Sequence, residues 1–284
     1  MKQVINPTFT KTLNCRGQLV VLDKPVVMGI VNLTPDSFYD QSRKQGVEEA
    51  IQQALTHLDH GATWLDFGAV STRPGAEFVS EQEEMDRLLP TLEALRKERP
   101  EALISIDTFR ASVAKAAIDL GADMINDVTA GSDPDLFKVV AAGQIPLVLM
   151  HSRGNPQNMQ TLTQYDHLVE DILSFFSERC NQARDCGVMD IIVDPGFGFA
   201  KTVEQNFELM RELHRFNVLN RAVLVGISRK SMIYKSLNTD ASGALNGTTA
   251  LHMIALQKGA HILRVHDVQP ALECIALHQR LQIS

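Results

Sequence analysis

A regular alternation of short apolar runs and longer helical patterns is the feature that most limits how these 284 residues can fold. From Pro25 onward, no linker rich in proline, glycine or serine interrupts it. The predicted strands are Val26–Val31, Thr63–Phe67, Leu103–Ile106, Met124–Ile125, Ile145–Leu149, Met189–Val193, Ala222–Ile227 and His261–Val265. The predicted helices are Val47–His60, Glu81–Glu98, Ala111–Leu120, Pro134–Ala142, Tyr165–Cys186, Val203–Leu213, Ala241–Lys258 and Pro270–Leu281.

Glycine marks the boundary between several helices and the strands that follow them. Gly61, Gly121 and Gly259 are each followed by alanine and an apolar run, as a helix C′ position before a strand requires. Alternating strands and helices predict a parallel sheet, and eight such units that close on themselves predict an α/β fold, the TIM (β/α)8 barrel. An open doubly wound sheet is the alternative, although the G-x-G-x-x-G turn of dinucleotide folds is missing after the first strand.

The amount of apolar material and the N-terminal pattern indicate how the chain is divided. With 284 residues and a hydrophobic content of 44%, the chain can form a large core, and its length suits one large α/β domain or two ordinary ones. Because no linker interrupts the alternation, residues 1–284 are predicted to form a single barrel domain. Residues 1–24 contain two short β-like stretches around Gly17, which predict an N-terminal β-hairpin that caps one end of the barrel.

Charge and apolar run length restrict the partners and the compartment. A net charge of −7 and a pI near 5.7 argue against nucleic acid or an anionic membrane as a partner. The sequence shows no run suited to spanning a bilayer and no signal-peptide core at its start. The four cysteines have no metal-ligand spacing. We expect a cytoplasmic protein with reduced thiols.

The stretch V-D-P-G-F-G-F-A-K, from Val193 to Lys201, closes the apolar run that starts at Met189. Pro195 fixes an acid, Asp194, at the end of a predicted strand, and two glycines and two phenylalanines follow. This pattern indicates the floor of a ligand site. A simple turn in which Asp194 caps the next helix is the alternative interpretation.

Side chains suited to binding follow every predicted strand, at the edge where ligands bind in barrels and in open sheets. They are Asn32, Asp36, Asp66, Ser71, Thr72, Arg73, Asp107, Asn126, Asp127, Met150, His151, Asp194, Ser228, Arg229, Lys230, Arg264, His266 and Asp267. A single such residue usually caps a helix or lies on the surface, but a set at all eight ends indicates one convergent site. Structural roles stay open for Arg229, as a solvated helix start, and for Asp127 and Asp267, as loop caps.

The chemistry of this set indicates the class of ligand. Asp107, Asn126 and Asp194, with the cation of Lys230, suit a flat heterocycle that has donors and acceptors along one edge. Arg264 can stack on such a ring or hold an anion. The segment Ser228-Arg229-Lys230-Ser231 is predicted to open a helix right after the seventh strand, where phosphate sites recur in barrels. The sequence therefore predicts a heteroaromatic ligand that carries phosphate.

Eight motifs, taken in order, resemble those of the dihydropteroate synthase family. They are M-G-I-V-N-L-T-P-D-S-F (28–38), S-T-R-P-G (71–75), I-D-T (106–108), I-N-D (125–127), L-M-H (149–151), D-P-G-F-G-F (194–199), S-R-K-S (228–231) and R-V-H-D-V (264–268). They extend over nearly the whole chain. The resemblance implies a pterin-binding TIM barrel that joins 4-aminobenzoate to 7,8-dihydropterin-6-ylmethyl diphosphate and releases pyrophosphate, which is a step of folate synthesis.

The same resemblance implies a role for each matching residue. The pterin residues would be Asp107, Asn126, Met150, Asp194, Lys230 and Arg264. The diphosphate residues would be Asn32, Arg264 and His266, with Asn32 also holding Mg²⁺. Phe38, Thr72, Arg73, Pro74, Phe199 and Ser231 would line the aminobenzoate side and its loops. The catalytic residues would be Asp36, Asp107, Lys230, Arg264 and His266.

The implied reaction needs charge stabilisation more than it needs a strong base. If the bond to diphosphate breaks first, an electron-rich dihydropterin can delocalise the positive charge on its exocyclic methylene. Mg²⁺, Arg264 and His266 would offset the leaving anion, and Asp107 or Asp36 would favour the cation. The arylamine is uncharged at neutral pH and can then attack directly.

Two loops depart from the pattern of this family. The first continues Ser37–Lys44 without the usual pair of glycines. The second reads Gly68-Ala69-Val70 where a glycine and a carboxylate are usual, and Ala200 replaces the glycine that usually precedes Lys201. We expect ordinary pterin affinity, but a shifted KM for aminobenzoate and a shifted inhibition by sulfonamides.

Two other functions fit part of the pattern. A methyltransferase that uses methyltetrahydrofolate and a corrinoid protein shares the pterin acids, but it gives no reason for the S-T-R-P-G and R-V-H-D motifs. A non-catalytic paralogue would bind pterin or a partner protein without turnover. The release of pyrophosphate in the presence of Mg²⁺ separates both alternatives from the synthase.

The family resemblance also implies a homodimer through the last two predicted helices, Ala241–Lys258 and Pro270–Leu281. The apolar residues available there are Leu245, Leu251, Ile254, Leu272 and Ile275. Packing of these helices against the barrel would use the same residues, so both explanations stay open.

Overall fold

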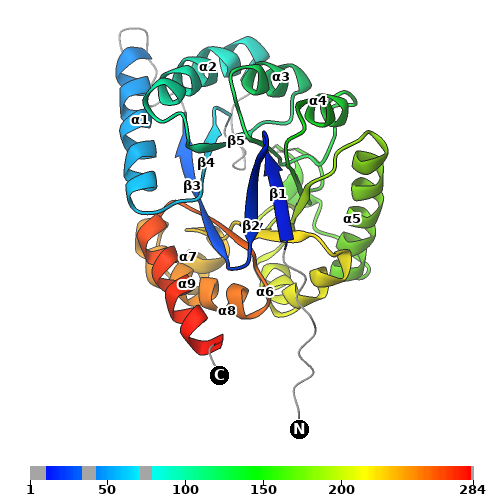
Figure 1. Cartoon of the computed structure of the whole chain (residues 1–284). Coiled ribbons are helices and arrows are strands. Elements are labelled where there is room, and N and C mark those ends of the chain that lie inside the picture. Colours follow the sequence, from blue (N-terminus) through cyan, green and yellow to red (C-terminus); the bar gives the residue numbers. More distant parts are fainter. Residues whose placement is uncertain (1–10, 34–42, 71–78, 156, 283–284) are drawn as a thin grey trace.

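A closed parallel barrel forms the centre of the computed structural model, which describes residues 11–33, 43–70, 79–155 and 157–282. The strand order is β10-β3-β4-β5-β6-β7-β8-β9, and helices surround the barrel (Figure 1). The strands are β3 (Val26–Asn32), β4 (Trp64–Gly68), β5 (Leu103–Asp107), β6 (Met124–Asp127), β7 (Leu147–Met150), β8 (Ile191–Asp194), β9 (Ala222–Val225) and β10 (Ile262–Val265). The predicted TIM barrel is confirmed, and an open sheet is excluded because β10 pairs with both β3 and β9.

The helices follow the predicted alternation with small shifts at their ends. They are α1 (Arg43–Asp59), α2 (Glu81–Glu98), α3 (Ala111–Asp119), α4 (Leu136–Gly143), α5 (Leu168–Asp185), α6 (Val203–Arg211), α7 (Ser231–Ser236), α8 (Leu245–Gln257) and α9 (Val268–Gln282). In the part of the chain that the structure describes, the 3₁₀ turns are η2 (Met159–Thr161), η3 (Leu213–Leu219) and η4 (Ser242–Ala244). None of these helices, within the described residues, is both long and apolar enough to cross a membrane.

For two of the predicted boundaries that differ from the structure, the reason can be identified. The strand predicted from Met189 begins at Ile191, because Met189 is 77% exposed and lies before the barrel wall. The helix predicted from Ala241 begins as the 3₁₀ turn η4 and becomes α-helical only at Leu245. By contrast, Gly61, Gly121 and Gly259 all have positive φ, as the predicted turns between helix and strand require.

Side chains alternate along each strand between the surrounding helices and the barrel interior, as the period of a pleated strand requires. Val27, Leu65 and Ile104 belong to the core that strands and helices share. A separate core inside the barrel includes Met28, Trp64, Leu103, Met124, Val148, Ile192, Leu224 and Ile262. The next inward positions along β4, β5 and β6 are Asp66, Ser105 and Asn126, so the interior changes from apolar to polar toward the C-terminal ends of the strands.

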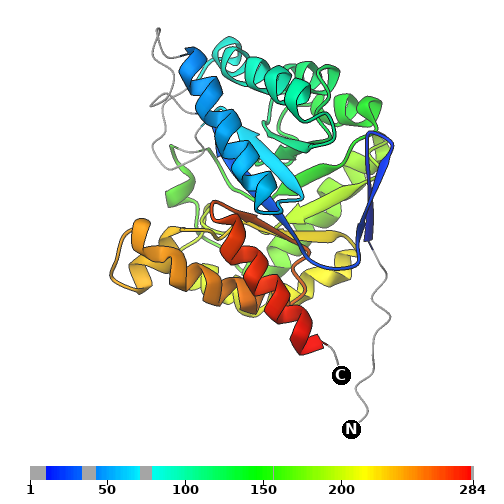
Figure 2. The ribbon, with the colours of Figure 1, turned by 60° about the vertical axis from the view of Figure 1, so that its left-hand side comes forward.

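An N-terminal hairpin closes the apolar end of the barrel. Its strands β1 (Lys11–Cys15) and β2 (Gln18–Leu22) are antiparallel, and both turn residues, Arg16 and Gly17, have positive φ. Leu13, Cys15 and Leu22 pack on the inner core of the barrel. The hairpin lies across one end of the barrel (Figures 1 and 2), as predicted. The polar side chains are therefore at the opposite end.

Burial of His252 in α8 makes the free energy of unfolding depend on pH. The ring is 2% exposed, and neither ring nitrogen has a hydrogen-bond partner among the described residues. Burial lowers its pKa to about 4, whereas an unfolded histidine titrates near 6.5. Unfolding between these values takes up a proton, so this histidine opposes folding increasingly as the pH falls below about 6.5.

We predict that His252→Leu stabilises the fold, and more so in acid. Relative to wild type, the variant should gain about 2 kcal/mol more at pH 5 than at pH 7.5, because the pH falls about 1.5 units below the unfolded pKa. Urea unfolding at the two pH values measures this difference. The exposed His214→Gln is the matched control. An equal effect of His252→Leu at both pH values would contradict the prediction.

Candidate active site

Arg264 of β10 lies between two carboxylates near the C-terminal end of the barrel. Its Nε donates to Asp66 Oδ2 at 2.6 Å, and its Nη2 donates to Asp107 Oδ2 at 2.8 Å. Asp66 is completely buried and also accepts hydrogen bonds from Ser105 Oγ at 2.6 Å and Asn126 Nδ2 at 3.0 Å. These contacts join side chains of β4, β5, β6 and β10 into one polar cluster.

Asp194, at the end of β8, forms a second part of the site. Its Oδ1 accepts a hydrogen bond from the backbone N–H of Gly196 at 2.8 Å. A Cβ placed on Gly226 would lie 3.8 Å from Asp194 Oδ2 and 3.9 Å from the Cβ of Arg264. Asp194 and Arg264 therefore flank a stretch of backbone that carries no side chain. A side chain at position 226 would contact both residues.

The alternative interpretation of Asp194 as a helix cap is wrong. The next helix, α6, begins at Val203, and Thr202 caps it through the backbone N–H of Gln205. Gln205 in turn accepts from the backbone N–H of Thr202 at 2.9 Å, which completes a capping box. The carboxylate of Asp194 is thus not required at the helix start.

Lys230 connects the loop after β8 to the start of α7. Its Nζ donates to the carbonyl oxygen of Phe197 at 2.5 Å and lies 4.6 Å from the centre of the Phe199 ring. Burial lowers the pKa of Lys230 to about 8, while nearby Asp194 opposes that change. The ammonium therefore lies between the predicted pterin floor and an aromatic residue predicted to line the aminobenzoate side.

Burial also shifts the acids of the site toward the protonated form. It raises the pKa of Asp107, and the charge of Arg264 opposes the rise. It raises the pKa of Asp194, which Lys230 opposes most strongly. Each buried acid thus has a cation close by, as a buried charge requires. The protonation of each acid therefore depends on the balance between its burial and the neighbouring cation.

The predicted site residues fall into three groups. Asp107, Asn126, Asp194, Lys230 and Arg264 lie at the polar end of the barrel, as the contacts above show, and Met150 is buried there as the register partner of Asp194. Asn32 ends β3 and lies in register with Gly68, which is in register with Asp107. Asp36, Phe38, Thr72, Arg73 and Pro74 lie outside the described residues.

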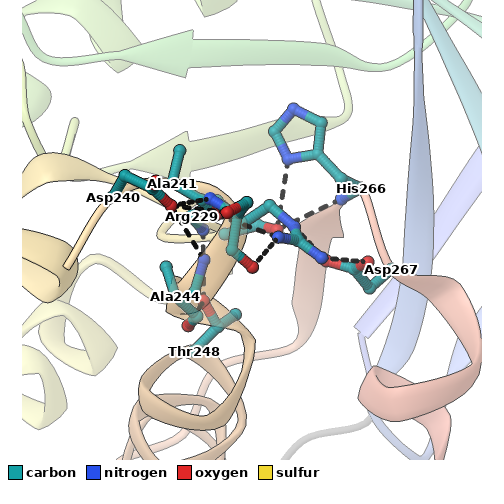
Figure 3. A network of polar contacts seen from close by, with 10 residues as sticks. Arg229, Asp240, Ala241, Ala244, Thr248, His266 and Asp267 are labelled. Carbon is teal, nitrogen blue, oxygen red and sulfur yellow. Dashed lines mark hydrogen bonds and ion pairs between the residues drawn. The ribbon is translucent and has the colours of Figure 1, made fainter.

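Arg229, in the loop after β9, forms an ion pair with Asp267, in the loop after β10 (Figure 3). Its Nε and Nη2 donate to the two carboxylate oxygens of Asp267 at 2.8 and 2.9 Å. Its Nη1 donates to the carbonyl oxygens of Ala241 and Ser242, both at 2.9 Å, and its backbone N–H donates to Thr248 Oγ1 at 3.1 Å. The interpretation of Arg229 as a solvated helix start is therefore wrong, and Asp267 serves as its ion-pair partner.

The same network positions His266, a predicted diphosphate residue (Figure 3). Its backbone N–H donates to Ser228 Oγ at 3.2 Å, and its Nδ1 lies 3.2 Å from that oxygen. Ser228 immediately precedes Arg229, and Ser231 begins α7 two residues later. The S-R-K-S and R-V-H-D segments are therefore joined as one unit at this end of the barrel.

Asp127 has the structural role that the sequence suggested. It accepts hydrogen bonds from the backbone N–H of Thr129 at 2.8 Å, from Thr129 Oγ1 at 2.7 Å and from the backbone N–H of Gly131 at 2.5 Å. The loop-cap interpretation is confirmed.

Sequence reasoning missed three residues that organise the site. Asp66 and His151 are among the polar residues at predicted strand ends, but the sequence assigns neither a role, although the position of Asp66 two residues after Trp64 predicts that it points inward. His151 and Lys201 form a buried pair, with Lys201 Nζ 3.0 Å from His151 Nδ1. Hydrophobic periodicity cannot predict that a lysine in a loop is buried, so the burial of Lys201 is evident only in the folded structure.

Comparison with known proteins places this geometry in a family. A model of pterin binding enzymes matches residues 28–266. The dihydropteroate synthase of Synechocystis sp. is 48% identical over 247 residues, which are 86% of this chain and 85% of the relative. The chain belongs to the dihydropteroate synthase family. The predicted family and the predicted enzyme class, a transferase, are confirmed.

Solved structures of this family have the same fold. Xanthomonas albilineans dihydropteroate synthase with 4-aminobenzoic acid has a TM-score of 0.90 at 38% identity, and the match covers 97% of this chain and 100% of that chain. Yersinia pestis dihydropteroate synthase in a sulfonamide drug complex has a TM-score of 0.90 at 38% identity, with 96% and 100% covered. The match therefore includes the whole barrel.

Proposed function

We propose that this chain condenses 7,8-dihydropterin-6-ylmethyl diphosphate with 4-aminobenzoate to give 7,8-dihydropteroate and pyrophosphate. The observation that carries the proposal is the convergence of Asp107, Asn126, Asp194, Lys230 and Arg264 at the end of the barrel opposite the hairpin. A family relative with 4-aminobenzoic acid and another with a sulfonamide drug, as described above, support the choice of the second substrate.

The polar groups suit the edge of a pterin. Asp107 and Asp194 are acceptors for ring N–H and amino groups, and the Asn126 amide can both donate and accept. Lys230 offers a donor for the pterin carbonyl, and Arg264 offers a planar cation for its face. Met150 is buried and is the register partner of Asp194 between β7 and β8. Its side chain would form part of the floor beneath the pterin.

Asn32, Arg264 and His266 are proposed to hold the diphosphate, and Asn32 would also hold the Mg²⁺ ion. Among the described residues, no group of three or more histidine, cysteine or acidic side chains is arranged to hold a metal ion. One amide oxygen fits a magnesium ion that arrives with the substrate, because Mg²⁺ takes few protein ligands where phosphate oxygens supply the rest. When bound, the ion would add Lewis-acid stabilisation of the leaving group.

The residues favour a stepwise substitution. Arg264 and His266 would stabilise the departing diphosphate, while Asp107, with Asp36, would stabilise the pterin cation. Phe199 and Ser231, with Phe38, Thr72, Arg73 and Pro74, would then orient the uncharged arylamine for attack. Positional isotope exchange in the substrate diphosphate, without the amine, tests the order of steps. Exchange is expected, and its absence would favour concerted attack.

Location and assembly are further parts of the proposal. We propose a cytoplasmic enzyme, since Cys15, Cys180, Cys186 and Cys274 are all free thiols. We propose a homodimer through α8 and α9. Ile254 and Leu277 are 38% and 61% exposed there, whereas Ile275 is buried in the barrel core. Light scattering measures the oligomeric state directly.

We predict that the purified protein, supplied with the pterin diphosphate and Mg²⁺, releases pyrophosphate at a rate that increases strongly with 4-aminobenzoate. Asp194→Asn should lower that rate about 100-fold or more, because a buried charge-assisted contact to the pterin is lost. A coupled assay for pyrophosphate measures both values.

Asp190→Asn is the matched control for this experiment. Asp190 lies just before the opposite end of β8, where its carboxylate accepts from the backbone N–H of Asn14, so the rate should stay near wild type. No amine-dependent release by wild type that still binds the pterin substrate would indicate a non-catalytic paralogue. Equal rates for wild type and Asp194→Asn would reject the proposed pterin floor.

A further inference from the structure

Lys201 is a buried cation to which the reaction proposed above gives no role. It is 5% exposed. Its Nζ donates to the carbonyl oxygens of Gly196 and Phe199 at 2.9 and 3.0 Å and lies 3.0 Å from Nδ1 of His151. An ammonium has three protons and no acceptor site, so these three partners account for all of its hydrogen-bonding capacity.

The side chains around Lys201 accommodate its charge without a direct ion pair in the described residues. Burial lowers the pKa of His151 to about 2, so this ring is neutral and its Nδ1 can accept a hydrogen bond from the Lys201 ammonium. The ring packs edge-on against Phe175, with centroids 4.9 Å apart. Burial lowers the pKa of Lys201 to about 7, Asp194 opposes this change, and Lys230 and Arg153 add to it. The main partners of Lys201 are therefore neutral acceptors.

The two carbonyl groups that Lys201 binds belong to Gly196 and Phe199, in the loop after β8. These two residues have different proposed roles. The backbone N–H of Gly196 binds the carboxylate of Asp194, the proposed pterin acid. Phe199 is a proposed aminobenzoate residue, and its ring lies against Lys230. The ammonium of Lys201 therefore binds the backbone both at Gly196, on the proposed pterin side, and at Phe199, on the proposed aminobenzoate side.

Other contacts show that the shape of this loop is tightly determined. Gly196 has a positive φ, and a Cβ there would lie 1.9 Å from the carbonyl oxygen of His151. Ala200 has a φ of 49°, which is strained for a residue with a Cβ. Its carbonyl oxygen accepts from the Tyr165 hydroxyl at 3.0 Å. A loop in such a conformation persists only when surrounding contacts hold it, and Lys201 makes two of them.

We propose that Lys201 is a positioning residue that couples the pterin and aminobenzoate sides of the site. By binding the carbonyls of Gly196 and Phe199, it sets the direction of the Asp194 carboxylate and the place of the Phe199 ring together. It touches neither substrate. This inference rests on the proposed function, since it concerns how the same two substrates are aligned.

The test measures steady-state kinetics of Lys201→Met, which keeps an unbranched side chain of similar length but removes the charge and all three donors. Two buried carbonyls then lose their partner. We expect KM for the pterin diphosphate and KM for 4-aminobenzoate each to rise about 10-fold or more, by the usual effect of unpaired buried acceptors on local structure. Both constants are measured on protein whose folded fraction is determined by circular dichroism.

Two further variants keep the test decisive if Lys201→Met does not fold. Lys201→Arg retains charge and donors and should give KM values between those of wild type and Lys201→Met. His151→Phe keeps the ring that packs on Phe175 but removes the acceptor, and it should raise both KM values in the same direction. Lys115→Met is the matched control. Lys115 is an exposed lysine of α3 that binds Asp119 at 2.7 Å, so both KM values should stay at the wild-type level.

The outcomes separate this inference from the proposed function. A rise of both KM values in the Lys201 variants supports the coupling. Unchanged KM values with only a lower melting temperature, or a rise for one substrate alone, would overturn it while the enzyme still turns over. Absence of turnover by wild type would instead reject the proposed function.

Discussion

The ion pairs of Arg264 with Asp66 and Asp107 are the constraint on which the site depends. Two carboxylates in a barrel interior would repel each other and lose their hydration. Arg264 offsets this cost with a separate nitrogen for each acid. Removing one member of such a buried arrangement typically costs about 3–5 kcal/mol. The side chains proposed to bind the pterin are therefore also required for the stability of the barrel end that holds them.

This arrangement divides the barrel into two functional halves. The hairpin and an apolar layer around Trp64 and Met28 fill one end, where burial of hydrocarbon provides stability. The other end keeps fixed carboxylates, amides and cations directed into the interior, where they need little reorganisation on binding. The two lysines of the site, Lys201 and Lys230, bind carbonyls of the loop after β8. These hydrogen bonds hold the loop after β8, which has no regular secondary structure, in a fixed conformation.

Much of the fold and part of the site could be predicted because they depend on local patterns. The eight alternations and the glycines before strands predicted the barrel, since each unit has its own periodicity. The motif residues Asp107, Asn126, Asp194, Lys230 and Arg264 lie near or just after the C-terminal ends of strands, so their convergence followed from topology. The roles of Asp66 and Arg229 did not, because each depends on partners far away in sequence. The buried contacts of Lys201 could not be predicted either, because one acceptor, His151, lies beside it only when β7 and β8 pair, although the carbonyls of Gly196 and Phe199 are close in sequence.

The central claim is that Asp66, although completely buried, sets the geometry of the pterin site through Arg264 and Asn126. Calorimetric titration of wild type and Asp66→Asn with the dihydropterin diphosphate tests it most directly. We expect Asp66→Asn to keep its helical circular dichroism but to bind about 10-fold more weakly or worse, because Arg264 loses a charged partner. A dissociation constant equal to that of wild type would show that the pterin site does not depend on these ion pairs, and would contradict the account.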